Sequence, residues 1–178
     1  LLIARCREFQ GRFREAVGEY SACLAVWPDE SEIYLNRGLA NYQARDYSEA
    51  SLDFAEARRL NPALTTSLVW KALCHQALGE NQKAIEELDR ALEESCPETR
   101  IYFIRARNRD AIGDRVGAER DRKEGLAREP TDELSFVNRG FYLLGTDPEK
   151  ARADFRAALD LNPRSEVALK NLAHVEGE

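Results

Sequence analysis

The chain has 178 residues, of which 43% are hydrophobic and 33% are charged, and its formal net charge is −6. This balance is too apolar for a disordered chain and too charged for a membrane protein, so it predicts a soluble, ordered protein. No apolar run approaches the roughly 20 residues that span a bilayer. The negative charge, without a basic face interleaved with aromatic residues, argues against nucleic acid as a partner.

The first four residues read LLIA and are followed at once by Arg5 and Arg7. This is not the core of a signal peptide, so we expect a cytoplasmic protein. The sequence contains no methionine. We therefore expect a processed or excised piece of a longer protein.

A repeat of 34 residues runs through the sequence. Alanines keep this step at Ala16, Ala50, Ala84 and Ala118, and Ala151 follows after 33 residues. Prolines keep the same step at positions 28, 62 and 130, and Pro163 follows after 33 residues. A strict period in this range indicates a stack of small units, each of which buries its apolar face against its neighbours.

Within each period, apolar residues recur at steps of three and four, which predicts two antiparallel helices per unit and an all-α fold. The second helices of the successive units are expected over 12–26, 48–60, 82–94, 116–128 and 148–161. The first helices are expected over 32–44, 66–78, 100–112, 134–144 and 166–176. We divide the chain, as a single array, into a partial repeat over 1–30, full repeats over 31–64, 65–98, 99–132 and 133–165, and an orphan or capping helix over 166–178.

Small residues such as Gly38 and Ala50 are predicted where the two helices of a unit cross, because bulk there would force the axes apart. The fourth repeat departs from this pattern. It has Arg122 and Gly125 where an aromatic residue and an alanine belong, so its second helix should be the least well packed. The fifth repeat has one residue fewer before Ala151, which should tighten its internal turn.

The sequence offers no constellation for catalysis, for a metal or for a cofactor. The four cysteines, Cys6, Cys23, Cys74 and Cys96, form no C-x-x-C pair, and we interpret them as reduced packing residues. His75 is interpreted as a hydrogen-bonded interior histidine. No nucleophile and base share a helix face, so we expect a protein that is not an enzyme.

The second repeat, with Tyr34, Gly38, Ala50, Phe54 and Pro62, resembles the tetratricopeptide repeat. The resemblance extends over essentially the whole chain. It implies a right-handed α-α superhelix whose concave groove is lined by the first helices and holds an extended or helical peptide.

Transferred position by position, the resemblance implies a largely apolar set of groove residues. In the second and third repeats these are Leu35, Asn36, Leu39, Tyr42, Val69, Trp70, Leu73 and Gln76. In the fourth and fifth repeats and the last helix they are Arg100, Phe103, Arg107, Asp110, Val137, Asn138, Phe141, Leu144, Lys170 and His174. Arg100 and Arg107 are expected to flank Phe103 and to bind a carboxylate. The alternative is that Leu39, Leu73 and Phe141 brace neighbouring first helices.

Asn36 matches the central asparagine of the clamp with which one subclass of the family holds chaperone tails. Arg5, Thr66 and Trp70 do not match its companions, so we do not expect a chaperone-tail adaptor. Residues 65–98 have a net charge of −4 and residues 99–132 of about +2. The basic repeat would orient a partner with an acidic segment.

These observations favour a non-catalytic scaffold for protein interaction that binds a peptide or partner segment in the groove. One alternative is a regulatory or substrate-recruiting tail of a larger enzyme, such as a bacterial serine/threonine kinase. A second is self-assembly through apolar ends. The residues expected to be uncovered at those ends are Leu1, Leu2, Ile3, Leu169, Leu172 and Val175.

Overall fold

A computed structural model describes residues 1–177, which form eleven helices and no strand. In chain order the helices are α1 (Leu2–Phe9), α2 (Phe13–Val26), α3 (Ser31–Gln43), α4 (Tyr47–Leu60), α5 (Thr66–Ala77), α6 (Asn81–Glu93), α7 (Arg100–Ala111), α8 (Arg115–Leu126), α9 (Glu133–Leu143), α10 (Pro148–Leu161) and α11 (Glu166–Glu176). The ends of α2 to α11 lie within two residues of the predicted ones. Among these residues, every helix is too short or too polar to cross a membrane.

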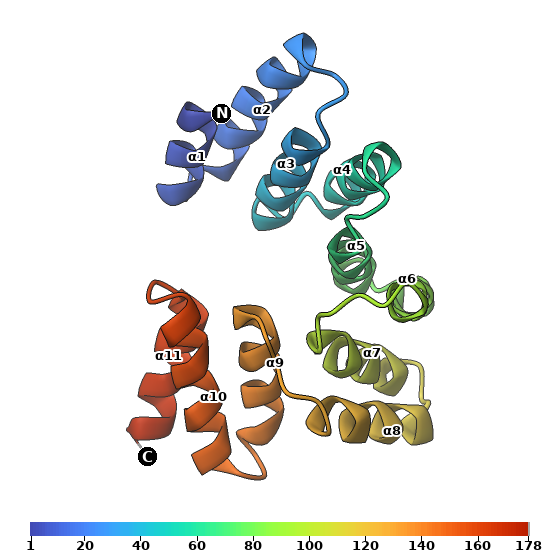
Figure 1. The fold of residues 1–178 in the computed structure, drawn as a ribbon, viewed down its shortest axis with the longest axis vertical. Coiled ribbons are helices and arrows are strands. Elements are labelled where there is room, and N and C mark those ends of the chain that lie inside the picture. The colour runs from blue at the N-terminus through green and yellow to red at the C-terminus, as the bar shows by residue number, and fades with distance from the viewer. Residues whose placement is uncertain (178) are drawn as a thin grey trace. The chain divides into compact units, whose positions relative to one another are not determined.

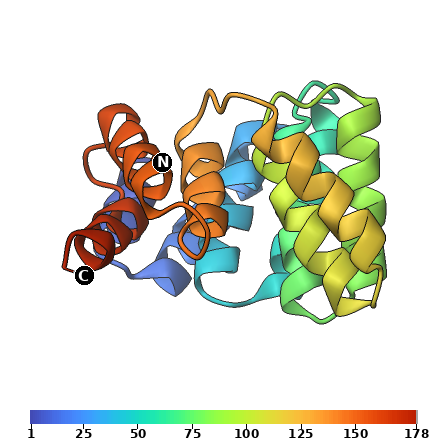
Figure 2. The ribbon, with the colours of Figure 1, turned by 90° about the horizontal axis from the view of Figure 1, so that it is seen from below.

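The helices group into two compact units. The first, Leu1–Cys96, contains α1 to α6, and the second begins at Pro97 and contains α7 to α11. Within each unit, the two helices of a repeat lie beside one another, as α3 and α4 or α9 and α10 do in Figure 1. Figure 2 shows α7 and α8 side by side along their length. Each unit is thus built from the predicted helix pairs.

Close approach at the helix crossings requires small residues. A Cβ atom added to Gly38 would lie 2.8 Å from Cε1 of Phe54, and one added to Gly140 would lie 2.8 Å from Cε1 of Phe155. Ala50 is completely buried on the facing helix. The predicted role of small residues at the crossings is therefore confirmed, and glycine stands where a phenylalanine ring faces it.

In the fourth repeat the glycine and the phenylalanine at the helix crossing have exchanged helices. Gly125 lies on the second helix, and a Cβ atom there would be 2.8 Å from Cζ of Phe103 on the first helix. Phe103 thus fills the space that the sequence suggested would be poorly packed. Arg122, in the slot that an aromatic residue usually takes, lies with its guanidinium 5.9 Å from the ring centre of Tyr142 and forms an ion pair with Asp110.

The turns inside the first four repeats share a left-handed residue at the 34-residue step. These residues are Gly11 (φ 71°), Arg45 (φ 67°), Gly79 (φ 77°) and Gly113 (φ 86°). Arg45 alone has a Cβ atom, which makes this conformation unfavourable. No residue over 133–165 has a positive φ, so the shorter fifth repeat changes its turn while α9 and α10 still pack together.

Each full repeat also has an ion pair between its two helices, which the sequence analysis missed. The pairs are Arg37 with Asp53 (2.6 Å), Lys71 with Glu87 (2.6 Å), Arg105 with Asp121 (2.5 Å) and Arg139 with Asp154 (2.8 Å). The hydrogen bonds that Arg37 donates to Asp53 and Arg139 donates to Asp154 raise the pKa of both arginines. The signal was present, because the basic residues keep the 34-residue step.

The apolar ends are only partly as predicted. Leu1, Leu2 and Ile3 are exposed, as is Leu169. Leu172 and Val175 are half-buried instead, because α11 packs on α10 and places them against the cluster around Phe155. The expectation that both are uncovered is corrected.

Candidate functional site

The structure divides the predicted groove residues by depth. Five are exposed: Arg107, Asp110, Phe141, Lys170 and His174. Nine are half-buried: Leu35, Asn36, Leu39, Tyr42, Trp70, Leu73, Gln76, Asn138 and Leu144. Four are buried: Val69, Arg100, Phe103 and Val137.

The buried residues require a correction. Val69 has no exposed surface, and Val137 packs in a cluster with Ala158 and Ala168, so neither lines an open groove. Arg100 is only 2% exposed, and its Nε donates to the Glu98 carboxylate while its backbone N–H donates to Ser135 Oγ at 3.1 Å. Arg100 therefore belongs to the interior and does not flank Phe103 at the surface.

In the first unit, the half-buried aromatic residues pack mainly on one another. The ring centres of Tyr42 and Trp70 are 5.5 Å apart, and those of Phe54 and Trp70 are 6.0 Å apart. Leu35 and Leu39 pack on the same cluster. These side chains join α3, α4 and α5, which agrees with the alternative interpretation that such residues brace neighbouring helices.

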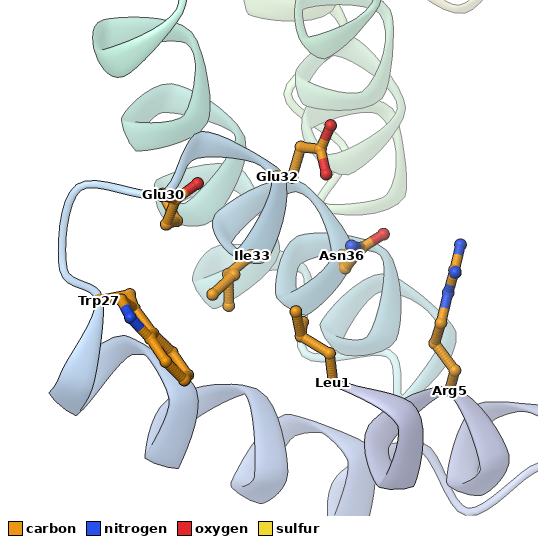
Figure 3. Close-up of a pocket in the computed structure, with 7 residues that line it drawn as sticks. All are labelled: Leu1, Arg5, Trp27, Glu30, Glu32, Ile33 and Asn36. Atoms are coloured by element: carbon orange, nitrogen blue, oxygen red, sulfur yellow. The ribbon is translucent and has the colours of Figure 1, made fainter.

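A hollow of about 320 Å³ lies near the start of the first unit. Figure 3 places Leu1 and Ile33 near its centre, Trp27 on one side and Arg5 and Asn36 on the other. Glu30 and Glu32 complete its lining. One predicted groove residue, Asn36, is in this set. The ionisable side chains that line the hollow are the carboxylates of Glu30 and Glu32 and the guanidinium of Arg5.

A second hollow, of about 330 Å³, lies in the second unit and collects four predicted groove residues. Its lining consists of Phe103, Arg107, Arg122, Asn138, Phe141 and Tyr142. They come from the first helices α7 and α9, with Arg122 alone from α8. Sequence reasoning missed Arg122 and Tyr142 as parts of this site.

The polar wall of this hollow is held in place by hydrogen bonds. Arg107 Nη2 donates to Asn138 Oδ1 at 3.1 Å, and Asn138 Nδ2 donates to the Leu134 carbonyl at 2.8 Å. Arg122 is positioned over the ring of Tyr142 and bound to Asp110. Two guanidinium groups are thus brought to the same aromatic hollow from two helices.

Phe141 extends the site towards the last helix. It is 42% exposed, and its ring meets that of Phe155 edge to face at 6.0 Å. It also lines an adjoining hollow of about 360 Å³ with Glu166, Val167, Lys170 and Asn171. The two hollows share Phe141, so the site extends over the first helices α7 and α9 and over α11.

The cysteines and His75 have structural surroundings, except for Cys6. All four cysteines are free; Cys74 and Cys96 are buried, whereas Cys6 is exposed, against the packing role predicted for it. Burial raises the pKa of the Cys74 thiol to about 12. His75 Nδ1 lies 2.6 Å from Glu80 Oε2, which agrees with the predicted hydrogen bond, but His75 is half-buried and not in the interior.

No group of three or more histidine, cysteine, aspartate or glutamate side chains within residues 1–177 is arranged to hold a metal ion. Hydrogen bonds from Lys83 and then His75 lower the pKa of Glu80.

Comparison with known proteins decides the family. The family model described as tetratricopeptide repeat matches residues 1–64 and again residues 42–99, which together are more than half of the chain. The chain belongs to the tetratricopeptide repeat family. Proteins of this family are generally non-catalytic scaffolds.

One curated relative and several solved tetratricopeptide repeat structures are similar to this chain along nearly its whole length. Human tetratricopeptide repeat protein 6 is 29% identical over 177 residues, which are 97% of this chain and 34% of that protein. A solved tetratricopeptide repeat protein of Thermus thermophilus superposes with a TM-score of 0.71 at 17% identity, covering 100% of this chain and 97% of that one. The α-α superhelix fold class predicted from the resemblance is thereby confirmed.

A third likeness is to YrrB, a tetratricopeptide repeat protein described as having an unusual peptide-binding site. Its TM-score is 0.60 at 21% identity, with 94% of this chain and 87% of that one covered. The chain spans between 9% and 34% of the length of the curated human and bovine relatives that it matches.

Proposed function

We propose that this tetratricopeptide repeat chain is a non-catalytic interaction scaffold that binds a peptide segment of a protein partner across the first helices of its second unit. The observation that carries the proposal is the pair of adjoining hollows that share Phe141. We also propose, as expected from the sequence, that the protein is cytoplasmic.

The size and composition of the site support a peptide ligand. Each hollow has a volume of about 330 to 360 Å³, within the range of about 300 to 1,000 Å³ that is typical of ligand sites. An exposed aromatic residue between polar rims is a usual anchor of protein interfaces. A tetratricopeptide repeat protein of similar fold, YrrB, is described as binding a peptide.

The test is affinity selection from a random library of soluble decapeptides, with mass spectrometry to identify the peptides that the protein retains. Wild type is compared with Phe141→Ala and with a matched control, Leu161→Ala, which removes an exposed apolar side chain from the second helix α10. We expect enrichment by wild type and by the control, and its loss in Phe141→Ala. Absence of enrichment by wild type, or full retention in Phe141→Ala, contradicts the proposal.

A further inference from the structure

We infer that the hollow near the start of the first unit binds the cationic side chain of an arginine or lysine from a partner protein. The hollow is lined by Leu1, Arg5, Trp27, Glu30, Glu32, Ile33 and Asn36. It is separate from the site proposed in the second unit and takes a different chemistry. The tetratricopeptide resemblance does not supply this inference, because Trp27 and Glu30 lie in the connection between α2 and α3 and not at the transferred groove positions.

The aromatic wall of the hollow is Trp27, which directly follows α2. Its backbone N–H donates to the Cys23 carbonyl at 2.9 Å, and the following Pro28 disfavours helical backbone angles at Trp27, so the helix ends here. The Trp27 side chain is 53% exposed. A cation over the face of an aromatic ring is attracted by it, and tryptophan gives the strongest contact of this kind.

Two carboxylates line the hollow without a partner of their own. Glu30 and Glu32 are both exposed, and Glu30 makes no capping hydrogen bond to α3. Neither carboxylate has an ion-pair or hydrogen-bond partner among residues 1–177. Figure 3 shows Glu30 on the same side of the hollow as Trp27. A cation over the indole ring would therefore also meet a carboxylate that is available to bind it.

The positive groups around the hollow do not neutralise these carboxylates. Arg5 lies across the hollow from Glu30 in Figure 3, and the Leu1 amino group lies 3.5 Å from Cys23 Sγ. Neither positive group forms an ion pair with Glu30 or Glu32. The side of the hollow with Glu30 is thus left negative, whereas Arg5 disfavours a second cation on the other side.

The floor of the hollow suits the apolar stem of a long basic side chain. Ile33 is 3% exposed and Leu1 is 54% exposed, and Figure 3 shows both near the centre. Lysine and arginine bury their methylene stems on apolar surface while the charged end stays at a polar rim. A basic side chain therefore matches the hollow along its length, whereas a small inorganic cation would leave the apolar floor uncovered.

The hollow in the second unit provides an internal contrast. Its lining contains the guanidinium groups of Arg107 and Arg122 and no carboxylate. A cationic side chain placed there would meet groups of its own charge, which disfavours binding. The preference for a basic side chain is thus a property of the hollow in the first unit.

The experiment titrates ¹⁵N-labelled protein with the peptide acetyl-Gly-Leu-Arg-Leu-Gly-amide, whose ends are uncharged. Contact through one side chain is weak, so a titration at high peptide concentration measures it, whereas retention from the decapeptide library does not. We expect the indole N–H resonance of Trp27 and the amide resonances of residues 30–36 to shift. Trp27→Phe assigns the indole resonance, because Trp70 is the only other tryptophan of the chain.

Neutral versions of the peptide test the charge. Citrulline in place of the arginine keeps the shape of the side chain without its charge, and it should weaken binding about tenfold. A lysine version of the peptide should bind, and its acetyl-lysine version should bind about tenfold more weakly. Equal binding of the charged and neutral peptides would overturn the inference.

Variants assign the contact to the hollow. Glu30→Gln should weaken the arginine peptide about fivefold and leave the citrulline peptide nearly unchanged. Glu49→Gln is the matched control, because Glu49 is exposed in the first turn of α4 and does not line the hollow. Circular dichroism checks that each variant is folded, and the citrulline comparison decides the question on wild type alone.

The two proposals fail independently. Phe141→Ala should bind the arginine peptide as tightly as wild type, even though it is expected to lose the peptides retained from the library. Absence of binding by wild type, or full binding by Glu30→Gln, overturns the inference of a cation site and leaves the proposed function standing. Loss of the arginine peptide in Phe141→Ala, or shifts confined to α7 and α9, overturns the placement in the first unit.

Discussion

The crossing of α3 and α4 yields a prediction whose sign depends on two opposing effects. Gly38 lies in the middle of α3, where replacement by alanine gains helix propensity of about 1 kcal/mol. The new Cβ atom would lie 2.8 Å from Cε1 and 3.0 Å from Cδ1 of Phe54, a completely buried ring, and 3.2 Å from Cβ of Asp53. Overpacking of this kind costs about 1 to 3 kcal/mol, so Gly38→Ala should be destabilising by about 1 kcal/mol.

Gly18 is the matched control in the same unit. It lies inside α2, is exposed, and has no atom within 4 Å of the position of its added Cβ. Gly18→Ala should therefore gain about 1 kcal/mol, and the difference of about 2 kcal/mol between the two variants measures the contact with Phe54. Urea unfolding followed by circular dichroism at 222 nm measures both, provided that the m-values agree.

A second substitution tests whether Phe54 is the cause. The third repeat has Ala72 and Leu88 at the positions of Gly38 and Phe54, and both are completely buried. Phe54→Leu should thus lower the free energy of unfolding when it is made in wild type, but change it little when it is made in the Gly38→Ala variant. The expected coupling energy between the two substitutions is about 1 to 2 kcal/mol. A Gly38→Ala variant as stabilised as Gly18→Ala, or a coupling of zero, would refute the reasoning.

Three further outcomes are expected. Arg45→Gly should raise the free energy of unfolding by about 1 kcal/mol in the same assay, because it relieves a left-handed backbone at φ 67°; a loss of stability would contradict this. Asp121→Ala should cost about 3 kcal/mol, because Asp121 is 1% exposed and binds both Arg105 and Arg109; a cost below that of an exposed ion pair would show that these bonds contribute little. In native protein at pH 8, Cys74 should react with iodoacetamide far more slowly than Cys6, because its thiol has a raised pKa of about 12 and is buried. Mass spectrometry of the labelled cysteines measures both rates, and equal rates would contradict this prediction. The same shift predicts that stability falls as the pH rises from about 9 towards 12, since the unfolded thiol ionises first.

The helix pairs could be predicted because the sequence signals that specify them are local and recur with the repeat. Small residues at the 34-residue step, prolines at the ends of second helices and apolar spacing of three and four are sufficient to place the helices. The repeated ion pairs were equally readable, since Arg37, Lys71, Arg105 and Arg139 keep the same phase. They were missed because charges on helices were interpreted as solvated.

The depth of individual groove residues was not predictable from position in the repeat. Arg100 is buried with Glu98 two residues before it and Ser135 from α9, a contact that depends on the geometry of two neighbouring repeats. Phe103 fills its crossing from the first helix because Gly125 leaves room on the second. Tyr142 and Arg122 join the site only once α9 lies against the fourth repeat.

The central claim is that the first helices of the second unit hold the ligand. The most direct measurement is a titration of ¹⁵N-labelled protein with the peptide that affinity selection retains, followed through the backbone amide resonances. We expect the largest shifts at residues 103–107 of α7, 138–142 of α9 and 167–171 of α11, and the Arg107 side-chain resonance should move with them. Shifts that are confined to the second helices α8 and α10, or to the first unit, would contradict the account.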